Sequence, residues 1–234
     1  MSRLRVALLD ASDAAHTPRN FRRELDADLV EFDAPAGDLP DGEDIDAAVV
    51  TGSRASVYWE EAWIRGLKQW VRDADERGLP LLGVCFGHQV LAAALGGDVA
   101  DMGAYEIGYR TVRHSGGRPF AGIDEEFLVF TTHSDEVVEL PPGAEPLAAN
   151  DYSNHAFRRG TAWGVQFHPE YDRRTAREVT EGKELDPDRK ERVLADITPE
   201  NERRAQQAKQ VFANFTEYVR ERPAVAGAET AADD

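Results

Sequence analysis

A single cysteine lies between two glycines, at the point where one local sequence pattern gives way to another. Cys85 is the only cysteine among 234 residues, and Gly83 and Gly87 flank it. The run "LPLLGV" before it has the pattern of a buried strand, and "HQVLAAALGG" after it has the pattern of a helix. A sharp strand-to-helix turn between small residues lifts a nucleophile above the edge of a sheet. The pattern therefore predicts that Cys85 is a catalytic nucleophile, whereas a cysteine without these neighbours is usually a small buried hydrophobe.

The predicted turn would also stabilise negative charge. The positive end of the following helix favours a thiolate over a thiol. The backbone N–H of Phe86 is placed to donate to an oxyanion, and one such donor contributes roughly 2.7–4 kcal/mol in other enzymes. We therefore expect Phe86 to form part of an oxyanion hole.

A thiol nucleophile needs a base, and the base needs a group that orients it. His168 ends the strand-like run "AWGVQFH" and is followed by Pro169 and Glu170. The proline fixes the backbone, so the imidazole and the carboxylate can lie on the same side. Glu170 can then hold one ring nitrogen and leave the other to take the thiol proton. The sequence predicts His168 as the base and Glu170 as its orienting group.

The other five histidines have weaker cases as the base. His16 is expected to face solvent from a polar loop, and His114 to lie in a turn. His155 begins a strand with a structural role, and His88 points away from the thiol. His133 ends a strand beside acidic residues and stays a candidate for the lining of the site.

Strand-like and helical segments alternate up to Gly97, which predicts a parallel sheet covered on both faces. The expected strands are 5–10, 29–34, 45–52 and 79–84. The expected helices are 17–25, with Thr17 as N-cap, 59–77, with Trp59 in its apolar stripe and Gly78 after its end, and 88–97. The predicted fold class is α/β, with a doubly wound, mostly parallel sheet.

After Gly97 the pattern changes to short strand-like runs, with a hairpin bend at Gly160 and Thr161. Residues 172–222 are mostly charged and helical, which predicts extra C-terminal helices. With no repeat and no interior linker, we expect one domain over 1–222. The last residues, 223–234, are expected to form a disordered acidic tail.

The chain is strongly acidic: 27 Lys and Arg against 44 Asp and Glu give a net charge of −17. Such a surface repels nucleic acid and anionic lipid, so neither is expected as a partner. The spread of the acidic residues suggests a halophilic source with a salty cytoplasm, where screening over about 3 Å at 1 M salt weakens the self-repulsion. One cysteine excludes an internal disulfide and a cysteine-rich zinc site. No apolar run reaches the roughly 18 residues of a membrane span, and the N-terminus lacks the features of a signal peptide. We expect a cytoplasmic protein with neither metal nor cofactor.

The two motifs "GVCFGHQ" and "GVQFHPE", in which 83 positions separate Cys85 from His168, resemble the signatures of the class I (triad-type) glutamine amidotransferases. The resemblance covers most of the chain, to about Tyr171. It implies a flavodoxin-like fold and hydrolysis of the glutamine side-chain amide to glutamate and ammonia. Cys85 would form a γ-glutamyl thioester, His168 would move protons, and Glu170 would support His168.

The resemblance also implies residues that contact the substrate. The backbone N–H of Gly52 matches the second oxyanion donor, and Gln89 matches a position that contacts the substrate glutamine. The "EIGY" stretch matches the segment that grips the amino-acid end of the substrate. Its candidate binding residues are Glu106, Gly108 and Tyr109, and His133 is added to them.

Within the family, the chain is most similar to the glutaminase part of GMP synthase and its free-standing relatives. The oxyanion loop reads "TGSR" instead of Ser-Gly-Gly-Pro, and "THSD" replaces Ser-His-Gly-Asp. Because the chain has no ATP-pyrophosphatase loop, the resemblance implies an ATP-dependent synthetase subunit that receives the ammonia in trans. Two alternatives remain, which are a stand-alone γ-glutamyl hydrolase or peptidase and a non-catalytic module on the same fold.

Overall fold

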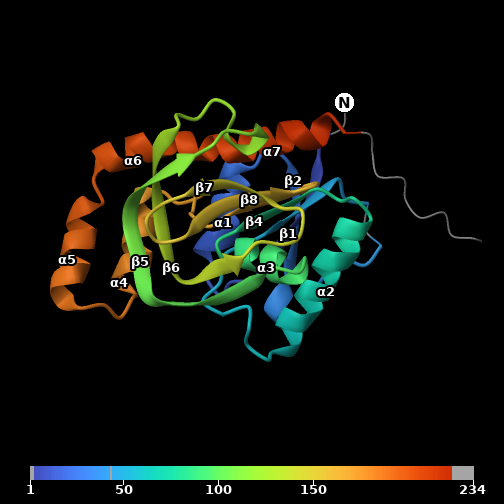
Figure 1. The fold of residues 1–234 in the computed structure, drawn as a ribbon, viewed down its shortest axis with the longest axis horizontal. Coiled ribbons are helices and arrows are strands. Elements are labelled where there is room, and N and C mark those ends of the chain that lie inside the picture. The colour runs from blue at the N-terminus through green and yellow to red at the C-terminus, as the bar shows by residue number, and fades with distance from the viewer. Residues whose placement is uncertain (1–2, 43, 223–234) are drawn as a thin grey trace, which may run out of the picture.

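The computed structural model describes residues 3–42 and 44–222, which form one nine-stranded sheet with helices packed on both faces (Figure 1). The sheet order is β2-β1-β3-β4-β9-β8-β7-β5-β6. The predicted α/β fold class is confirmed. The predicted tail at 223–234 lies outside the described residues.

The first half of the sheet is parallel, as the alternation of strands and helices predicted. Strand β1 pairs with β2 and β3, β3 pairs with β4, and β4 pairs with β9. The five strands are β1 (Arg5–Asp10), β2 (Asp28–Asp33), β3 (Ala47–Val50), β4 (Leu81–Val84) and β9 (Ala162–Val165). The helices between the first four are α1 (His16–Glu24) and α2 (Ala62–Glu76), and α3 (Phe86–Ala94) follows β4.

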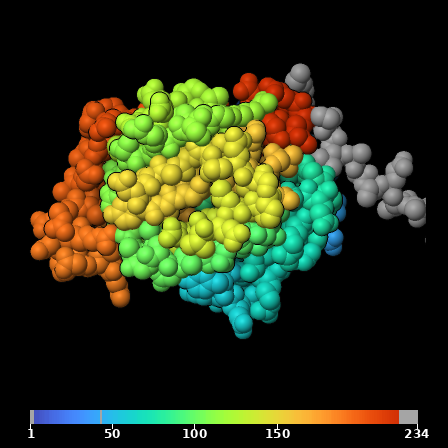
Figure 2. Space-filling model, viewed as in Figure 1, coloured from blue at the N-terminus to red at the C-terminus, as the bar shows by residue number. Residues whose placement is uncertain are grey.

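The second half of the sheet is antiparallel, so the parallel part is larger by only one strand. Its surface, green to yellow, covers much of the face seen in Figure 2. The four strands are β5 (Asp98–His114), β6 (Glu126–Glu139), β7 (Glu145–Ala149) and β8 (Asn154–Arg159). The bend between β8 and β9 falls at Gly160 and Thr161, as predicted.

Two apolar clusters lie on opposite faces of the sheet because side chains alternate along each strand. On β1, Val6 and Leu8 belong to one cluster together with residues of α1 and of α7 (Gln210–Arg220). Ala7 and Leu9 belong to the other cluster together with residues of α2 and α3. The alternating side chains of one short strand thus pack against helices on both faces of the sheet.

The C-terminal helices extend this core along the edge of the antiparallel half (Figure 1). Helices α4 (Arg173–Glu181) and α5 (Pro187–Asp196) pack on β5 and β6 through a third apolar cluster, and α6 (Pro199–Ala205) leads to α7. Among the described residues, no helix is long and apolar enough to cross a membrane.

Two local predictions about helix ends are wrong. Helix α1 begins at His16 with Ala15 as its N-cap, so Thr17 lies inside the helix and is buried. Helix α2 begins at Ala62, so Trp59 precedes it and stays 46% exposed instead of joining the apolar stripe. The helix ends as predicted, because Gly78 follows the cap with a φ of +72°.

The turn after β4 depends on glycines because backbones approach each other closely there. A Cβ on Gly83 would lie 2.3 Å from the carbonyl oxygen of Gly87, and a Cβ on Gly87 would lie 2.1 Å from the carbonyl oxygen of Val50. The N–H of Gly87 donates to the Thr51 carbonyl at 3.1 Å. Both glycines therefore let α3 begin directly against β3 and β4.

Replacing Gly87 with alanine should destabilise the fold because the added methyl group meets backbone and not a movable side chain. We expect Gly87→Ala to lower the free energy of unfolding by about 1–3 kcal/mol, as overpacking does in other protein cores. Gly66→Ala in α2 is the matched control, since nothing lies within 4 Å of its Cβ position, and a gain of about 1 kcal/mol is expected. Urea unfolding measures both, and equal stabilities for the two variants would contradict the explanation.

Candidate active site

Cys85 occupies the turn between β4 and α3 in a strained conformation. Its φ is +54°, which makes it the only non-glycine residue with a positive φ in the described part of the chain. Such strain costs of order 1–3 kcal/mol and clusters at active sites. Its N–H donates to the Val165 carbonyl at 2.8 Å, and its thiol lies 3.8 Å from the Thr132 carbonyl oxygen. The side chain is buried but lines a cavity.

His168 and Glu170 follow β9, the parallel neighbour of β4. The N–H of His168 donates to the Phe130 carbonyl at 2.9 Å, which ties this segment to β6. Its Nδ1 lies 2.8 Å from Glu170 Oε1, and its ring stacks on Tyr171 with centroids 4.1 Å apart. The opposite nitrogen, Nε2, is buried and has no hydrogen-bond partner among the described residues. That nitrogen is therefore available for the proton of a thiol.

The charge state of His168 depends on its neighbours. Burial lowers the pKa of His168, but attraction to Glu170 and to Cys85 outweighs burial and raises the pKa to about 10. At neutral pH this favours an imidazolium that is paired with the Glu170 carboxylate through Nδ1.

Gly52 lies directly against these groups. A Cβ at this position would lie 3.0 Å from Cε1 of His168 and 3.7 Å from Cβ of Cys85. Phe86 is the first residue of α3, where backbone N–H groups have no partner within the helix. The two residues expected to supply the oxyanion donors therefore lie next to Cys85 in the fold.

The cavity beside Cys85 has two lobes. One lobe contains Gly52, His168 and Glu170, and the other contains Gln89 and His133. The two lobes share five residues, which are Ser53, Arg54, Cys85, Thr132 and Lys183. A substrate bound in one lobe would therefore present its reacting bond at the sulfur and its leaving group toward the other.

Gln89 is held in place at the wall of the second lobe. Its Nε2 donates to the Asp135 carbonyl at 3.0 Å and to Oε1 of Gln166 at 3.2 Å. Nδ1 of His133 lies 3.0 Å from the same Asp135 carbonyl oxygen. One backbone carbonyl thus joins the two predicted binding residues that reach the cavity.

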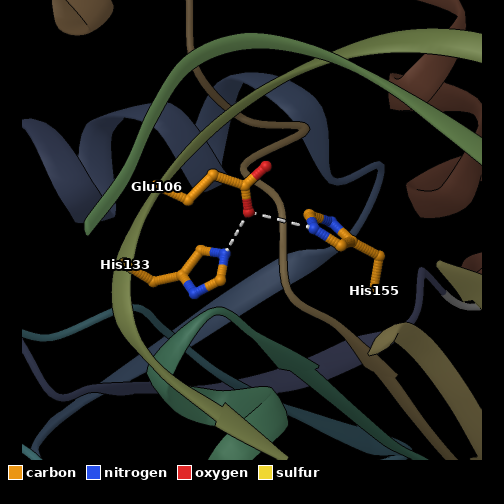
Figure 3. A group of neighbouring side chains, drawn as sticks. All are labelled: Glu106, His133 and His155. Carbon is orange, nitrogen blue, oxygen red and sulfur yellow. Dashed lines mark hydrogen bonds and ion pairs between the residues drawn. The ribbon is translucent and has the colours of Figure 1, made fainter. Parts of the chain in front are cut away.

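Glu106 is not among the residues that line the cavity. Its carboxylate points toward the rings of His133 and His155 (Figure 3). Its Oε2 accepts from Nε2 of His133 at 2.7 Å and from Nε2 of His155 at 3.2 Å. Its Oε1 accepts from Asn150 Nδ2 at 2.6 Å. Metals also bind to these residue types, but the distances are those of direct hydrogen bonds. The cluster therefore joins β5, β6 and β8 next to the second lobe of the cavity.

The structure does not bring the other two predicted binding residues to the cavity. Gly108 lines a separate hollow beside α5, and Tyr109 packs edge-to-face on Phe130 in the third apolar cluster. The "EIGY" stretch thus reaches the site only through its neighbours on β5. Any contact of Glu106, Gly108 or Tyr109 with substrate would need a rearrangement of this strand.

Several cavity residues were missed or misplaced by sequence reasoning. His16 was expected to face solvent, but it lies half-buried in the cavity wall with its ring 6.2 Å from that of Tyr171. Tyr105 and Lys183 also line the cavity. The only sequence signal for Tyr105 is its position next to "EIGY". Lys183 has no such signal, because it follows α4 and reaches the cavity from a segment that is distant in the sequence.

Comparison with known proteins assigns the chain to a family. The model of the family "Glutamine amidotransferase class-I" matches residues 16–183, which include Cys85, His168 and Glu170. The chain belongs to the class I glutamine amidotransferases. This confirms the predicted family and the predicted amidohydrolase class.

The relatives of this amidotransferase include proteins with two different names. A GMP synthase (glutamine-hydrolyzing) of Thermomicrobium roseum is 41% identical over 52% of this chain and 23% of its own length. Gamma-glutamyl peptidase 5 of Arabidopsis thaliana is 32% identical over 61% of this chain and 62% of its own length. The chain therefore spans about a quarter of the GMP synthase and less than two thirds of the peptidase.

Solved structures agree with the fold of this amidotransferase. A glutamine amidotransferase of Thermotoga maritima superposes with a TM-score of 0.77 over 95% of this chain and all of its own, at 23% identity. A glutamine amidotransferase of Methylobacillus flagellatus superposes with a TM-score of 0.76 over 93% of this chain and 95% of its own, at 21% identity. At these identities the likeness establishes the fold alone.

The Glu106 cluster predicts a specific loss of stability in acid. Burial raises the pKa of Glu106, but hydrogen bonds from His133 and His155 outweigh burial and lower the pKa from 4.5 to about 2. Because the folded-state pKa is below the unfolded one, this stabilisation is present above pH 4.5 and is lost as the pH falls toward 2. Glu106→Gln should remove it.

We expect Glu106→Gln to be less stable than wild type at neutral pH by up to about 3 kcal/mol, with the difference shrinking between pH 4.5 and 2. Urea unfolding across this pH range measures the difference. Glu139→Gln is the matched control, because Glu139 is an exposed carboxylate at the end of β6. A difference that stays constant with pH would contradict the assignment of the lowered pKa.

Proposed function

We propose that this chain hydrolyses the side-chain amide of glutamine to glutamate and ammonia, with Cys85, His168 and Glu170 as its catalytic residues. The main observation in support is that Cys85, in the strained turn, and His168, whose imidazole is hydrogen-bonded to Glu170, line the same cavity. Family membership supports the same chemistry.

The proposed reaction proceeds through a thioester. The Cys85 thiolate attacks the amide carbon, and the N–H groups of Gly52 and Phe86 stabilise the oxyanion. The C–N bond breaks as the His168 imidazolium gives a proton to the departing ammonia. A water then attacks the thioester, His168 takes a proton from that water, and the C–S bond breaks to release glutamate.

The second lobe is the proposed binding site for the amino-acid end of the substrate. Arg54 and Lys183 supply positive charge for the α-carboxylate, and the carboxylate of Asp135 supplies negative charge for the α-ammonium. Oδ1 of Asp135 is held by the Tyr58 hydroxyl at 3.1 Å. Gln89 and His133 act by fixing the Asp135 carbonyl, and Glu106 acts through His133. Gly108 and Tyr109 would act only through the backbone of β5.

The ammonia produced would serve an ATP-dependent synthetase subunit in trans, as the likeness to GMP synthases suggests. Exposed Trp59, next to Tyr58 at the cavity, offers an apolar contact for such a partner. A reduced thiol nucleophile also favours a cytoplasmic location. The halophilic source stays a prediction from the charge of the chain.

A γ-glutamyl hydrolase or peptidase is the second candidate. The lobe on the His168 side is also lined by Ser12, Asp13 and His16, whose polar groups would contact a leaving group larger than ammonia. The sequence identity of 32% with gamma-glutamyl peptidase 5 also favours a peptidase. The non-catalytic alternative has no supporting contact at the site.

Loss of the sulfur should abolish turnover under both catalytic assignments. We expect Cys85→Ser to reduce ammonia release from glutamine, and amine release from a γ-glutamyl dipeptide, to background. Turnover of each substrate by the wild-type protein, measured with and without a candidate synthetase, distinguishes the two catalytic assignments. Ammonia release that the synthetase stimulates supports the role in amide transfer, and faster dipeptide cleavage without stimulation supports the peptidase. Unchanged turnover in the serine variant would refute the catalytic role of Cys85.

Glu170 should matter through His168. We expect Glu170→Gln to lower kcat by about a hundredfold or more with little change in KM, because the imidazole loses its orientation and charge partner. The same variant should slow alkylation of Cys85 by iodoacetamide at pH 7, which can be read by intact mass because the chain has one cysteine. An unchanged alkylation rate together with unchanged kcat would count against this role.

A further inference from the structure

A second cavity, of about 620 Å³, lies between β5 and α5 and does not contain Cys85. Figure 1 shows α5 beside the long strand β5 at this edge of the molecule. Arg110 lines the cavity from β5, and Arg189 and Arg192 line it from α5, while Val193 and Gly108 form apolar surface between them. The volume falls in the range of small-molecule sites, about 300–1,000 Å³.

The charge of this cavity is opposite to that of the chain. Three arginines line it against one carboxylate, that of Asp196, whereas the whole chain carries a net charge of −17. At physiological ionic strength, screening over about 8 Å limits the repulsion from the distant acidic surface. An anion inside the cavity would therefore respond mainly to the local arginines.

The arginines are only partly neutralised by the protein. Nη1 of Arg110 donates to the Tyr109 carbonyl at 2.8 Å, and Nη2 of Arg189 donates to the Tyr105 carbonyl. A carbonyl accepts a hydrogen bond without cancelling the charge. Nε of Arg110 also lies 3.9 Å from Oε1 of the buried Glu106, so Arg110 is partly paired. In the described part of the chain, neither Arg189 nor Arg192 is within ion-pair distance of a carboxylate, although twelve arginines outside this cavity are. The cavity thus retains donors and charge for a ligand.

Two tyrosines give the cavity a flat, amphipathic wall. The guanidinium of Arg110 lies 5.8 Å from the ring centre of Tyr152, which is 41% exposed. Tyr105 also lines this cavity and is part of the Cys85 cavity as well, where its hydroxyl lies 2.7 Å from Oγ1 of Thr132. Exposed tyrosine beside arginine suits a planar ring that carries an anionic group.

We propose that the Arg110–Arg189–Arg192 cavity binds a phosphorylated small molecule with a planar ring, of the class of nucleoside monophosphates. Guanidinium groups bind phosphate through paired, charge-assisted hydrogen bonds. The ring lies against Tyr152. Because Tyr105 is shared with the second lobe of the active site, the ligand is bound next to the catalytic cavity and outside it.

Calorimetric titration of the full chain with AMP, inorganic phosphate and adenosine tests the proposal. We expect AMP to bind more tightly than phosphate or adenosine, because only AMP has both the charge and the ring. Arg192→Gln should weaken AMP binding about tenfold or more. Arg204→Gln, an exposed arginine of α6 outside this cavity, removes the same charge and should leave binding unchanged.

A second variant separates the ring from the charge. Tyr152→Leu should weaken binding of AMP but not of phosphate, and because Tyr152 is surface-exposed the fold should be retained. The proposal is overturned if wild-type protein does not bind AMP, if adenosine binds as tightly as AMP, or if Arg192→Gln and Arg204→Gln behave alike. Binding of poly-glutamate without binding of AMP would also overturn it, because the surface would then accept an acidic protein instead. None of these results depends on glutaminase turnover.

Discussion

The parallel pairing of β4 with β9 is the constraint on which the active site depends. Val84 lies opposite Val165, so the residues after both strands emerge at the same edge of the sheet. The hydrogen bond from the Cys85 N–H to the Val165 carbonyl extends this pairing by one residue. Because the two strands are adjacent, a sulfur and an imidazole that are far apart in sequence come to line the same cavity. A slip in this register would separate them whatever the identity of the neighbouring side chains.

Strain and burial at this edge are offset by specific contacts. The positive φ of Cys85 persists because Gly83 and Gly87 allow α3 to approach β3 and β4 more closely than any side chain would permit. The buried imidazole of His168 keeps its charge because Glu170 lies beside it. The same principle acts next to the second lobe of the cavity, where two histidines hold the buried carboxylate of Glu106. Buried polar groups here are stabilised in linked sets, which fixes the cavity walls relative to one another.

The antiparallel half of the sheet contributes residues to both cavities. Strand β6 contributes Thr132, His133 and Asp135 to the Cys85 cavity, and β5 contributes Tyr105. Strand β5 also lines the arginine-rich cavity together with α5. Two chemically different cavities therefore share one strand.

The sequence by itself determined the family of this protein, with its amidohydrolase class, and the alternation of its elements. The glycines around Cys85 and the short spacing of His168 and Glu170 are local patterns, so their roles could be predicted without a fold. The sequence pattern could not show whether Glu106, Gly108 and Tyr109 reach the cavity. Successive side chains of one strand point to opposite faces of the sheet, and the pairing of the strands decides which face meets the cavity. For the same reason Trp59, His16 and Lys183 were misjudged or missed. Their positions depend on where a helix begins or on which distant segments pack together, and only the tertiary structure decides that.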